Sequence, residues 1–162
     1  MEDKPIRELT IERTFDAPRE LVWRAWTDPK LIAKWWGPMG VTNPTCEWDP
    51  RPNGKLYIVM EAGKELGPMA GAKWPMNGVF KEVTPQSRLV FSSNALDERQ
   101  EALLENMITV SFEDAGGQTK MKIHIAVTKA VAGKTKAMLE GMAAGWNQQT
   151  DKLVELVNGM KI

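Results

Sequence analysis

The chain has 162 residues, and its 21 Lys and Arg balance its 21 Asp and Glu, which gives a formal net charge of zero. This balance argues against a dedicated nucleic-acid binder, which needs a basic excess to displace counterions from phosphates. One cysteine excludes an internal disulfide framework, one histidine excludes the usual multi-imidazole metal site, and no apolar run is long enough for a signal peptide or membrane span. We therefore expect one domain over residues 1–162 with its core at about 6–157, in the cytoplasm, without metal, cofactor, nucleic-acid or membrane partner. Seven Trp against one Tyr, together with ten Met, are unusual for such a protein.

The N-terminal third combines one strand with two short helices. Residues 6–15 alternate apolar and polar side chains, which predicts a half-buried strand. Asp16 is expected to supply an N-cap oxygen, with Pro18 in the first turn of a helix that carries Leu21, Val22, Ala25 and Trp26. Asp28-Pro29 repeats this start signal for a second short helix, and Gly37-Pro38 ends it.

The middle of the chain predicts more strands separated by turns. They are expected over residues 41–48, around 56–60, and over 74–83, 88–93, 105–113 and 120–128, with a Gly-rich loop over 62–73. Residues 114–118 carry a clear hairpin signal. In the final strand Met121, Ile123, Ile125 and Val127 alternate with polar residues, the cleanest amphipathic strand of the chain.

From about Val131 to Val157 the apolar period changes to that of a helix, with an apolar face of Met138, Met142, Trp146, Gln149, Leu153 and Leu156 or Val157. Short turns between strands favour an antiparallel sheet, and this helix is the one element long enough to cover its apolar face. The predicted fold is α+β: a curved antiparallel sheet around a long C-terminal helix, with two short helices after the first strand.

Several segments resemble one known family. The stretch from Phe15 to Pro29, followed by Trp35-Trp36-Gly37-Pro38, is similar to the opening of the activator of Hsp90 ATPase homologue family, of the SRPBCC (START-like, Bet v-like) superfamily. Residues 78–91 resemble its central strand pair, and residues 109–119 and 141–153 its closing segments. Each motif alone is weak, but their order and spacing over about residues 6–157 are specific.

The resemblance implies a helix-grip fold of about seven strands with a cavity between sheet and helix, as in single-domain bacterial-type members. Relatives of this superfamily bind lipids, hormones or polyketides, and some are cyclases or aromatases. The eukaryotic co-chaperones carry a separate N-terminal domain that makes much of the chaperone contact. We expect that domain to be absent here, because the first strand begins at about residue 6.

The Trp and Met excess supplies the candidate ligand site. Flat rings and flexible thioethers line apolar pockets well, although each such residue could equally fill the core. The candidate ligand-binding residues are Trp35, Trp36, Met60, Trp74, Met76, Glu82, Phe91, Met138, Met142 and Trp146.

Glu82 is the single candidate for a catalytic or anchoring carboxylate. It shares parity with Phe80 and would line the cavity if Phe80 points inward, but the opposite parity is equally compatible with the sequence. Gly141 and Gly145 suggest a close approach of the helix to the sheet or to a ligand. His124 is expected to be exposed, and Cys46 to be a buried inert thiol.

The leading hypothesis is non-catalytic binding of a small hydrophobic molecule between the sheet and the C-terminal helix. One alternative is a protein-interaction module, a chaperone accessory in a stress response, which predicts an exposed apolar patch at residues 35–38. The other is a cyclase- or hydrolase-type enzyme that uses a cavity carboxylate. The sequence is compatible with a monomer or a homodimer.

Overall fold

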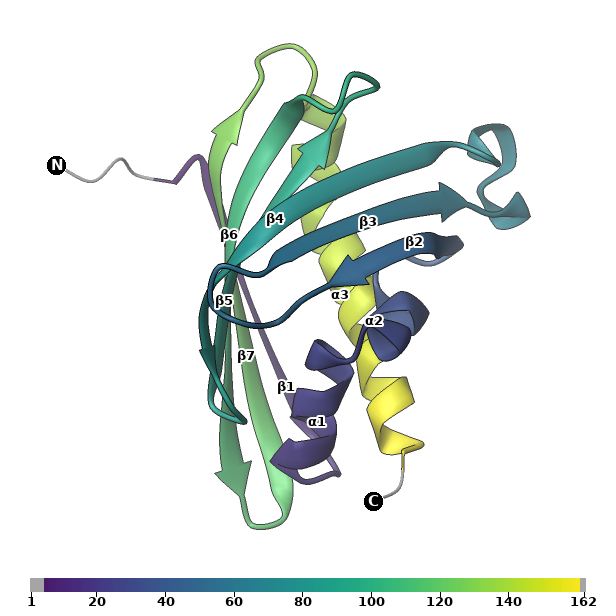
Figure 1. Cartoon of the computed structure of the whole chain (residues 1–162). Coiled ribbons are helices and arrows are strands. Elements are labelled where there is room, and N and C mark those ends of the chain that lie inside the picture. The colour runs from purple at the N-terminus through teal and green to yellow at the C-terminus, as the bar shows by residue number, and fades with distance from the viewer. Residues whose placement is uncertain (1–4, 161–162) are drawn as a thin grey trace, which may run out of the picture.

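A computed structural model describes residues 5–160, in which one antiparallel sheet of seven strands curves around a long helix (Figure 1). The strand order is β1-β7-β6-β5-β4-β3-β2. The strands are β1 (Arg7–Phe15), β2 (Val41–Trp48), β3 (Lys55–Ala62), β4 (Lys73–Thr84), β5 (Arg88–Leu96), β6 (Ala102–Ala115) and β7 (Gln118–Ala130). The helices are α1 (Arg19–Thr27), α2 (Pro29–Trp35), the short 3-10 helix η1 (Lys64–Met69) and α3 (Lys136–Asn158). The predicted α+β helix-grip architecture is confirmed.

The alternation of apolar side chains sets the inner face of the sheet, the face that α3 crosses. In β7 the side chains of Met121, Ile123, Ile125 and Val127 are buried, as the sequence predicts. Ile11 of β1 lies opposite Ile123, and Ile123 lies opposite Val110 of β6, so buried residues continue across neighbouring strands. This register is fixed because a slip by one residue would expose the whole apolar set.

The two short helices begin differently. Asp28 caps α2 as predicted, because its carboxylate accepts a hydrogen bond of 2.9 Å from the backbone N–H of Lys30. The predicted cap at Asp16 is wrong: the N-cap of α1 is Pro18, and no side chain caps this helix. Asp16 lies two residues before Pro18, and the capping bond requires the residue immediately outside the first turn.

Two predicted boundaries also shift. Helix α3 begins at Lys136 rather than near Val131, after a turn in which Gly133 has a φ of 80°. The predicted loop over 62–73 contains η1. Among the helices of residues 5–160, none is long and apolar enough to cross a membrane.

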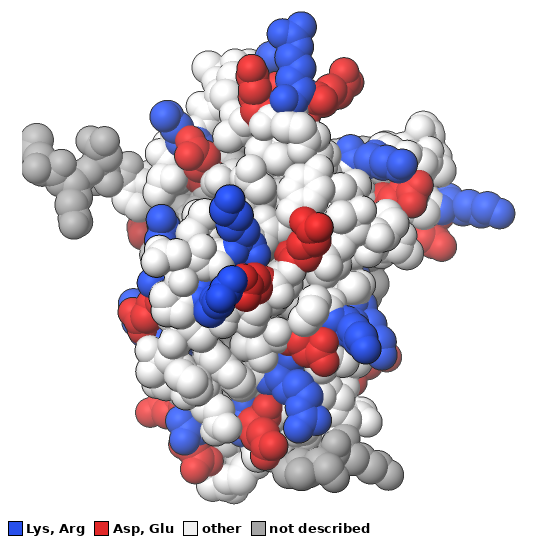
Figure 2. All heavy atoms as spheres, viewed as in Figure 1, with Lys and Arg blue, Asp and Glu red and all other residues white. Residues whose placement is uncertain are grey.

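Charges are dispersed over the surface. On the face in Figure 2, Lys and Arg side chains alternate with Asp and Glu side chains and form no extended patch of one sign. This distribution agrees with the zero net charge of the sequence.

Candidate functional site: the inner face beneath α3

The predicted site residues fall into two groups, of which the first belongs to the packed core. Trp35, Trp36 and Phe91 are almost fully buried. The ring centroid of Trp36 lies 5.5 Å from that of Trp35, 6.4 Å from that of Phe91 and 5.6 Å from that of Trp146. Tilted and edge-to-face pairs at these separations are favourable aromatic contacts. These rings therefore fill the space between α2, the sheet and α3.

The same burial decides against the predicted exposed apolar patch at residues 35–38. Trp35 and Trp36 are enclosed, and Trp35 donates its indole N–H to the carbonyl of Ala25 at 2.9 Å. The large apolar side chain that is exposed next to residues 35–38 is that of Met39, which is 51% exposed. That prediction is wrong because tertiary packing turns both rings inward.

Met76 connects the aromatic group to the sheet. The indole N–H of Trp36 points at the Met76 sulfur, with an N to S distance of 3.1 Å. The hydroxyl of Ser93, which is also buried, lies 3.8 Å from the same sulfur. Trp36, Met76 and Ser93 thus form a continuous contact from α2 across β4 to β5.

Three side chains of α3 hold residues 36–39, which we call the 36–39 corner. The backbone N–H of Gly37 donates to Gln149 Oε1 at 2.7 Å, and that of Met39 donates to Gln148 Oε1 at 3.0 Å. Lys152 Nζ lies 3.5 Å from the Trp36 carbonyl oxygen and 3.4 Å from that of Pro38. Burial lowers the pKa of Lys152, whose half-buried ammonium has lost hydration.

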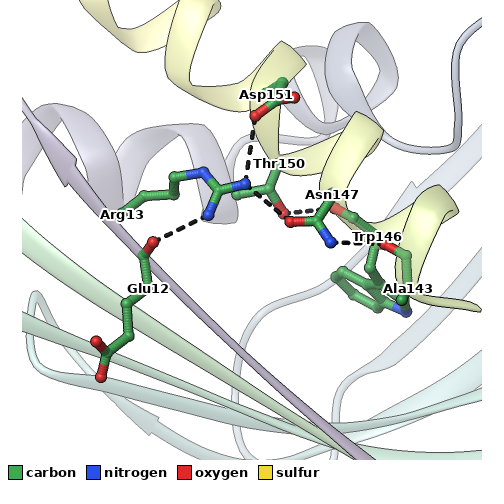
Figure 3. Close-up of polar contacts among 7 residues, drawn as sticks. All are labelled: Glu12, Arg13, Ala143, Trp146, Asn147, Thr150 and Asp151. Atoms are coloured by element: carbon green, nitrogen blue, oxygen red, sulfur yellow. Dashed lines mark hydrogen bonds and ion pairs between the residues drawn. The ribbon is translucent and has the colours of Figure 1, made fainter.

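The opposite flank of α3 is tied to β1 (Figure 3). Arg13 of β1 donates to Asn147 Oδ1 at 2.9 Å and pairs with Asp151 at 3.3 Å. One turn of α3 is therefore held from two sides, by β1 and by the 36–39 corner. The Trp146 indole leaves this turn on a different side from Asn147 (Figure 3).

Nearer its N-terminus, the corner-facing side of α3 has open surroundings. Gly141 and Gly145 continue the helical row of Gln148 and Lys152, because residues spaced by three or four share a helix side. A Cβ atom placed on either glycine would meet no heavy atom within 4 Å. The predicted close approach of these glycines to the sheet is therefore wrong, whereas the alternative, an approach to a ligand, stays a prediction.

The second group of predicted site residues stays half-buried. It comprises Met60, Trp74, Met138 and Trp146. Trp74 of β4 lies opposite Met60 of β3, and both have the inward parity of Met76 and Ile58. Met142, on α3 between Met138 and Trp146, is buried. We call these four half-buried residues, with Gly141 and Gly145, the open end.

Glu82 lies on the outer face of the sheet. A β-bulge between Phe80 and Glu82 adds one residue to β4, so both Phe80 and Val83 pack into the core. The Glu82 carboxylate pairs with Arg88 at 3.2 Å, and its side chain is 45% exposed. The expectation that Glu82 follows Phe80 inward is wrong, because the bulge reverses the alternation between them.

His124 and Cys46 have no part in the inner site. His124 lies on the outer face, with Nε2 at 3.1 Å from Glu8 Oε1. The Cys46 thiol is half-buried and lies 3.5 Å from the carbonyl oxygen of Pro29. Burial raises the pKa of this thiol to about 11, as expected of an inert cysteine.

Two hollows lie on the outer face of the sheet, and neither is lined by α3. One has a volume of about 480 Å³ and is lined by Glu47, Lys55, Leu56, Tyr57, Asn77, Gly78, Val79 and Asn94. The other, of about 820 Å³, is lined by residues 12–14, 87–88, 111–113 and 120–122. Their linings include charged side chains of both signs, unlike the open end.

Sequence reasoning missed the polar residues of the inner face. The helical period places Gln149 in the apolar row of α3 and does not mark it as a site residue. Ser93 and Asn106 lie opposite each other on β5 and β6, and neither was singled out. The available signal was a polar side chain at an inward position of an otherwise apolar strand or helix.

The curved antiparallel sheet, the long C-terminal helix on its inner face and the two helices after β1 together define a protein of the helix-grip class. The chain belongs to the family described as Activator of Hsp90 ATPase homolog 1-like protein, whose model matches residues 16–158. No curated protein gives a significant match to the chain.

Solved bacterial structures share this fold. The CV1439 protein of Chromobacterium violaceum is 23% identical, with a TM-score of 0.77, and the match covers 94% of this chain and 98% of that one. The NE0264 protein of Nitrosomonas europaea is 26% identical, with a TM-score of 0.70 and 93% of each chain covered. The AHSA1 protein SPO3351 of Silicibacter pomeroyi is 21% identical, with a TM-score of 0.74 and coverage of 93% and 97%.

Proposed function

We propose that this protein binds a small hydrophobic molecule that enters at the open end and lies between the sheet and α3. The observation that carries the proposal is a difference in surroundings along one side of α3, between its N-terminal half and its C-terminal half. Gln148 and Lys152 contact the 36–39 corner, whereas Gly141 and Gly145 on the same row face open surroundings. An apolar molecule lying there would contact Met60, Trp74, Met138 and Trp146.

The chemistry of the open end supports an apolar ligand. Burial of apolar surface drives such binding, and unbranched Met side chains adapt to ligands of different shape. Trp146 also connects the open end to the core, because its ring contacts Trp36. The buried Trp36, Met76 and Phe91 would then form the floor beneath the ligand rather than its walls.

The proposal is tested by filling the space beside α3. Gly145→Leu places a side chain in the open surroundings of the row, whereas Ala144→Leu adds the same group on the exposed side of the helix. A panel of fatty acids, sterols and aromatic polyketides is titrated while Trp fluorescence and melting temperature are followed. We expect at least one compound to bind the wild type and Ala144→Leu but not Gly145→Leu. A panel that changes neither signal in the wild type contradicts the proposal.

A protein-binding role is the second candidate, since the family description names an activator of the Hsp90 ATPase. Met39 and Met69 are 51% and 52% exposed. Met39 precedes Gly40, whose carbonyl accepts the Gly63 N–H at 2.7 Å, and Met69 ends the 3-10 helix that follows Gly63. The test is the ATPase rate of a purified bacterial Hsp90 with the wild type and with Met39→Ser/Met69→Ser. An unchanged rate with the wild type removes this candidate.

A further inference from the structure

The side chain of Gln149 presents a buried hydrogen-bond donor without a partner. Gln149 is 5% exposed and lies on the inner side of α3, one turn from Trp146. Its Oε1 accepts the backbone N–H of Gly37 at 2.7 Å, which fixes which end of the amide is the oxygen. Within residues 5–160 its Nε2 makes no hydrogen bond. A buried amide donor left unpaired is uncommon in native proteins and calls for an explanation.

The sheet presents polar groups of its own on the same side. Asn106 of β6 lies opposite Ser93 of β5 and Val127 of β7, and both of these neighbours are buried. Asn106 Oδ1 is also buried and has no hydrogen-bond partner within the described residues. The inner face thus carries one unused donor on α3 and one unused acceptor on β6, with the Ser93 hydroxyl next to the latter.

An apolar surface joins these groups. Ser93 contacts Met76, the indole N–H of Trp36 points at the same sulfur, and the Trp36 ring meets the Trp146 ring. Gln149 is connected to this group of residues through its hydrogen bond to Gly37, the residue next to Trp36. A ligand lying against Trp146, whose ring meets Trp36, would therefore lie within one helical turn of Gln149.

We propose that Gln149 Nε2 donates a hydrogen bond to an oxygen of the bound molecule, and that this molecule is uncharged, with an apolar body and a carbonyl or hydroxyl group. This inference rests on the proposed function and specifies its ligand class. The polar groups next to the contact between Trp36 and Met76, namely Gln149, Ser93 and Asn106, are all neutral. Within the described part of the chain, the cations that contact α3 all have partners: Lys152 is directed at the carbonyl oxygens of Trp36 and Pro38, Arg13 binds Asn147 and Asp151, and Arg7 donates to the carbonyl of Leu139. A carboxylate ligand would consequently be buried without a counter-charge, which is unfavourable.

The test uses three matched probes: 2-acetylnaphthalene, which carries a carbonyl acceptor; 2-ethylnaphthalene, which lacks it; and the anion 2-naphthoate. Affinities are measured by calorimetry on the full chain. We expect the wild type to bind 2-acetylnaphthalene about threefold to tenfold more tightly than 2-ethylnaphthalene, the range that one neutral hydrogen bond supplies. We expect 2-naphthoate to bind most weakly of the three.

Variants separate the donor from the structural bond. Gln149→Met removes the Nε2 donor and the Gly37 bond, whereas Gln148→Met removes the comparable bond to Met39 at a more exposed position. We expect Gln149→Met to bind the two neutral probes with equal affinity and Gln148→Met to keep the preference. If Gln149→Met fails to fold, the side-chain NH₂ resonances of Gln149 in the wild type decide, because 2-acetylnaphthalene should shift them and 2-ethylnaphthalene should not.

The outcomes distinguish this inference from the proposed function. Equal binding of both neutral probes to the wild type, or tighter binding of 2-naphthoate, overturns the role of Gln149 and leaves apolar ligand binding intact. A preference that survives in Gln149→Met overturns it as well. Absence of saturable binding for all three probes overturns the inference together with the proposed function.

Discussion

The amide of Gln149 binds the backbone N–H of Gly37 at 2.7 Å and so joins the middle of α3 to the end of α2. Gly37 can meet it because its φ of 88° is a left-handed conformation that glycine adopts without strain. The bond connects two segments 112 residues apart in sequence. It sets the position of α3 over the inner face, beside the aromatic core.

Gly37→Ala should destabilise the protein markedly. A Cβ atom on residue 37 would lie 2.4 Å from Val41 Cγ2 and 3.0 Å from the Met60 sulfur, in addition to the unfavourable φ. We expect a loss of about 2–4 kcal/mol in the free energy of unfolding, measured by urea denaturation. Gly71→Ala is the matched control, since Gly71 has a φ of 86° with no atom near its Cβ position. It should lose only about 1 kcal/mol, and equal losses in the two variants would contradict this account.

Trp36→Ala should remove the centre of the aromatic core. Its ring meets those of Trp35, Trp48, Phe91 and Trp146, and its indole N–H points at Met76. We expect a loss of about 3–5 kcal/mol in chemical denaturation. Trp23→Ala provides the comparison, because Trp23 is half-buried and its ring meets Phe112 alone among the aromatic residues described. Its loss should be about 1–2 kcal/mol, and the reverse order would show that the core is centred elsewhere.

Glu82→Gln should have little effect. The carboxylate is half-exposed and pairs with Arg88 on the outer face, and exposed ion pairs contribute about 0–1 kcal/mol. Thermal denaturation should detect at most that change, and ligand affinity should stay the same. A large loss of ligand affinity in a variant that stays folded would show that Glu82 contributes to binding.

Cys46 should react slowly with thiol reagents. Burial raises its pKa from 9.0 to about 11, so at about pH 8 the reactive thiolate is about 100-fold less abundant than at the ordinary pKa. A raised folded-state pKa contributes stability that is full below the unfolded value of 9.0 and is lost as the pH rises towards 11. We expect 5,5′-dithiobis(2-nitrobenzoate) to label the folded protein about 100-fold more slowly than the urea-unfolded protein. Equal rates would show that the thiol is accessible and ionised in the fold.

Local sequence patterns were enough to predict most of the elements and their inward sides. Period-two alternation identified β1 and β7, because a strand with one buried face must alternate. The change to a helical period identified α3, and Asp28-Pro29 marked the start of α2 through a local capping bond. Zero net charge and single Cys and His residues limited the classes of function. These properties depend on neighbours within a few residues, so they can be read along the chain.

Which of the predicted site residues belong to the core and which form the open end depends on tertiary packing. Trp35 and Met60 are both large apolar residues that the sequence offers as candidates for a ligand site. Contacts from distant segments enclose Trp35 and leave Met60 half-buried. A bulge of one residue in β4 turns Glu82 outward. The position of such a bulge depends on how the strands pair, not on local composition. The position of the Gln149 amide is set by its hydrogen bond to Gly37, and its burial follows from the packing of α3 against the inner face of the sheet. Burial and pairing over long sequence separations are properties of the folded chain, because they depend on which segments meet.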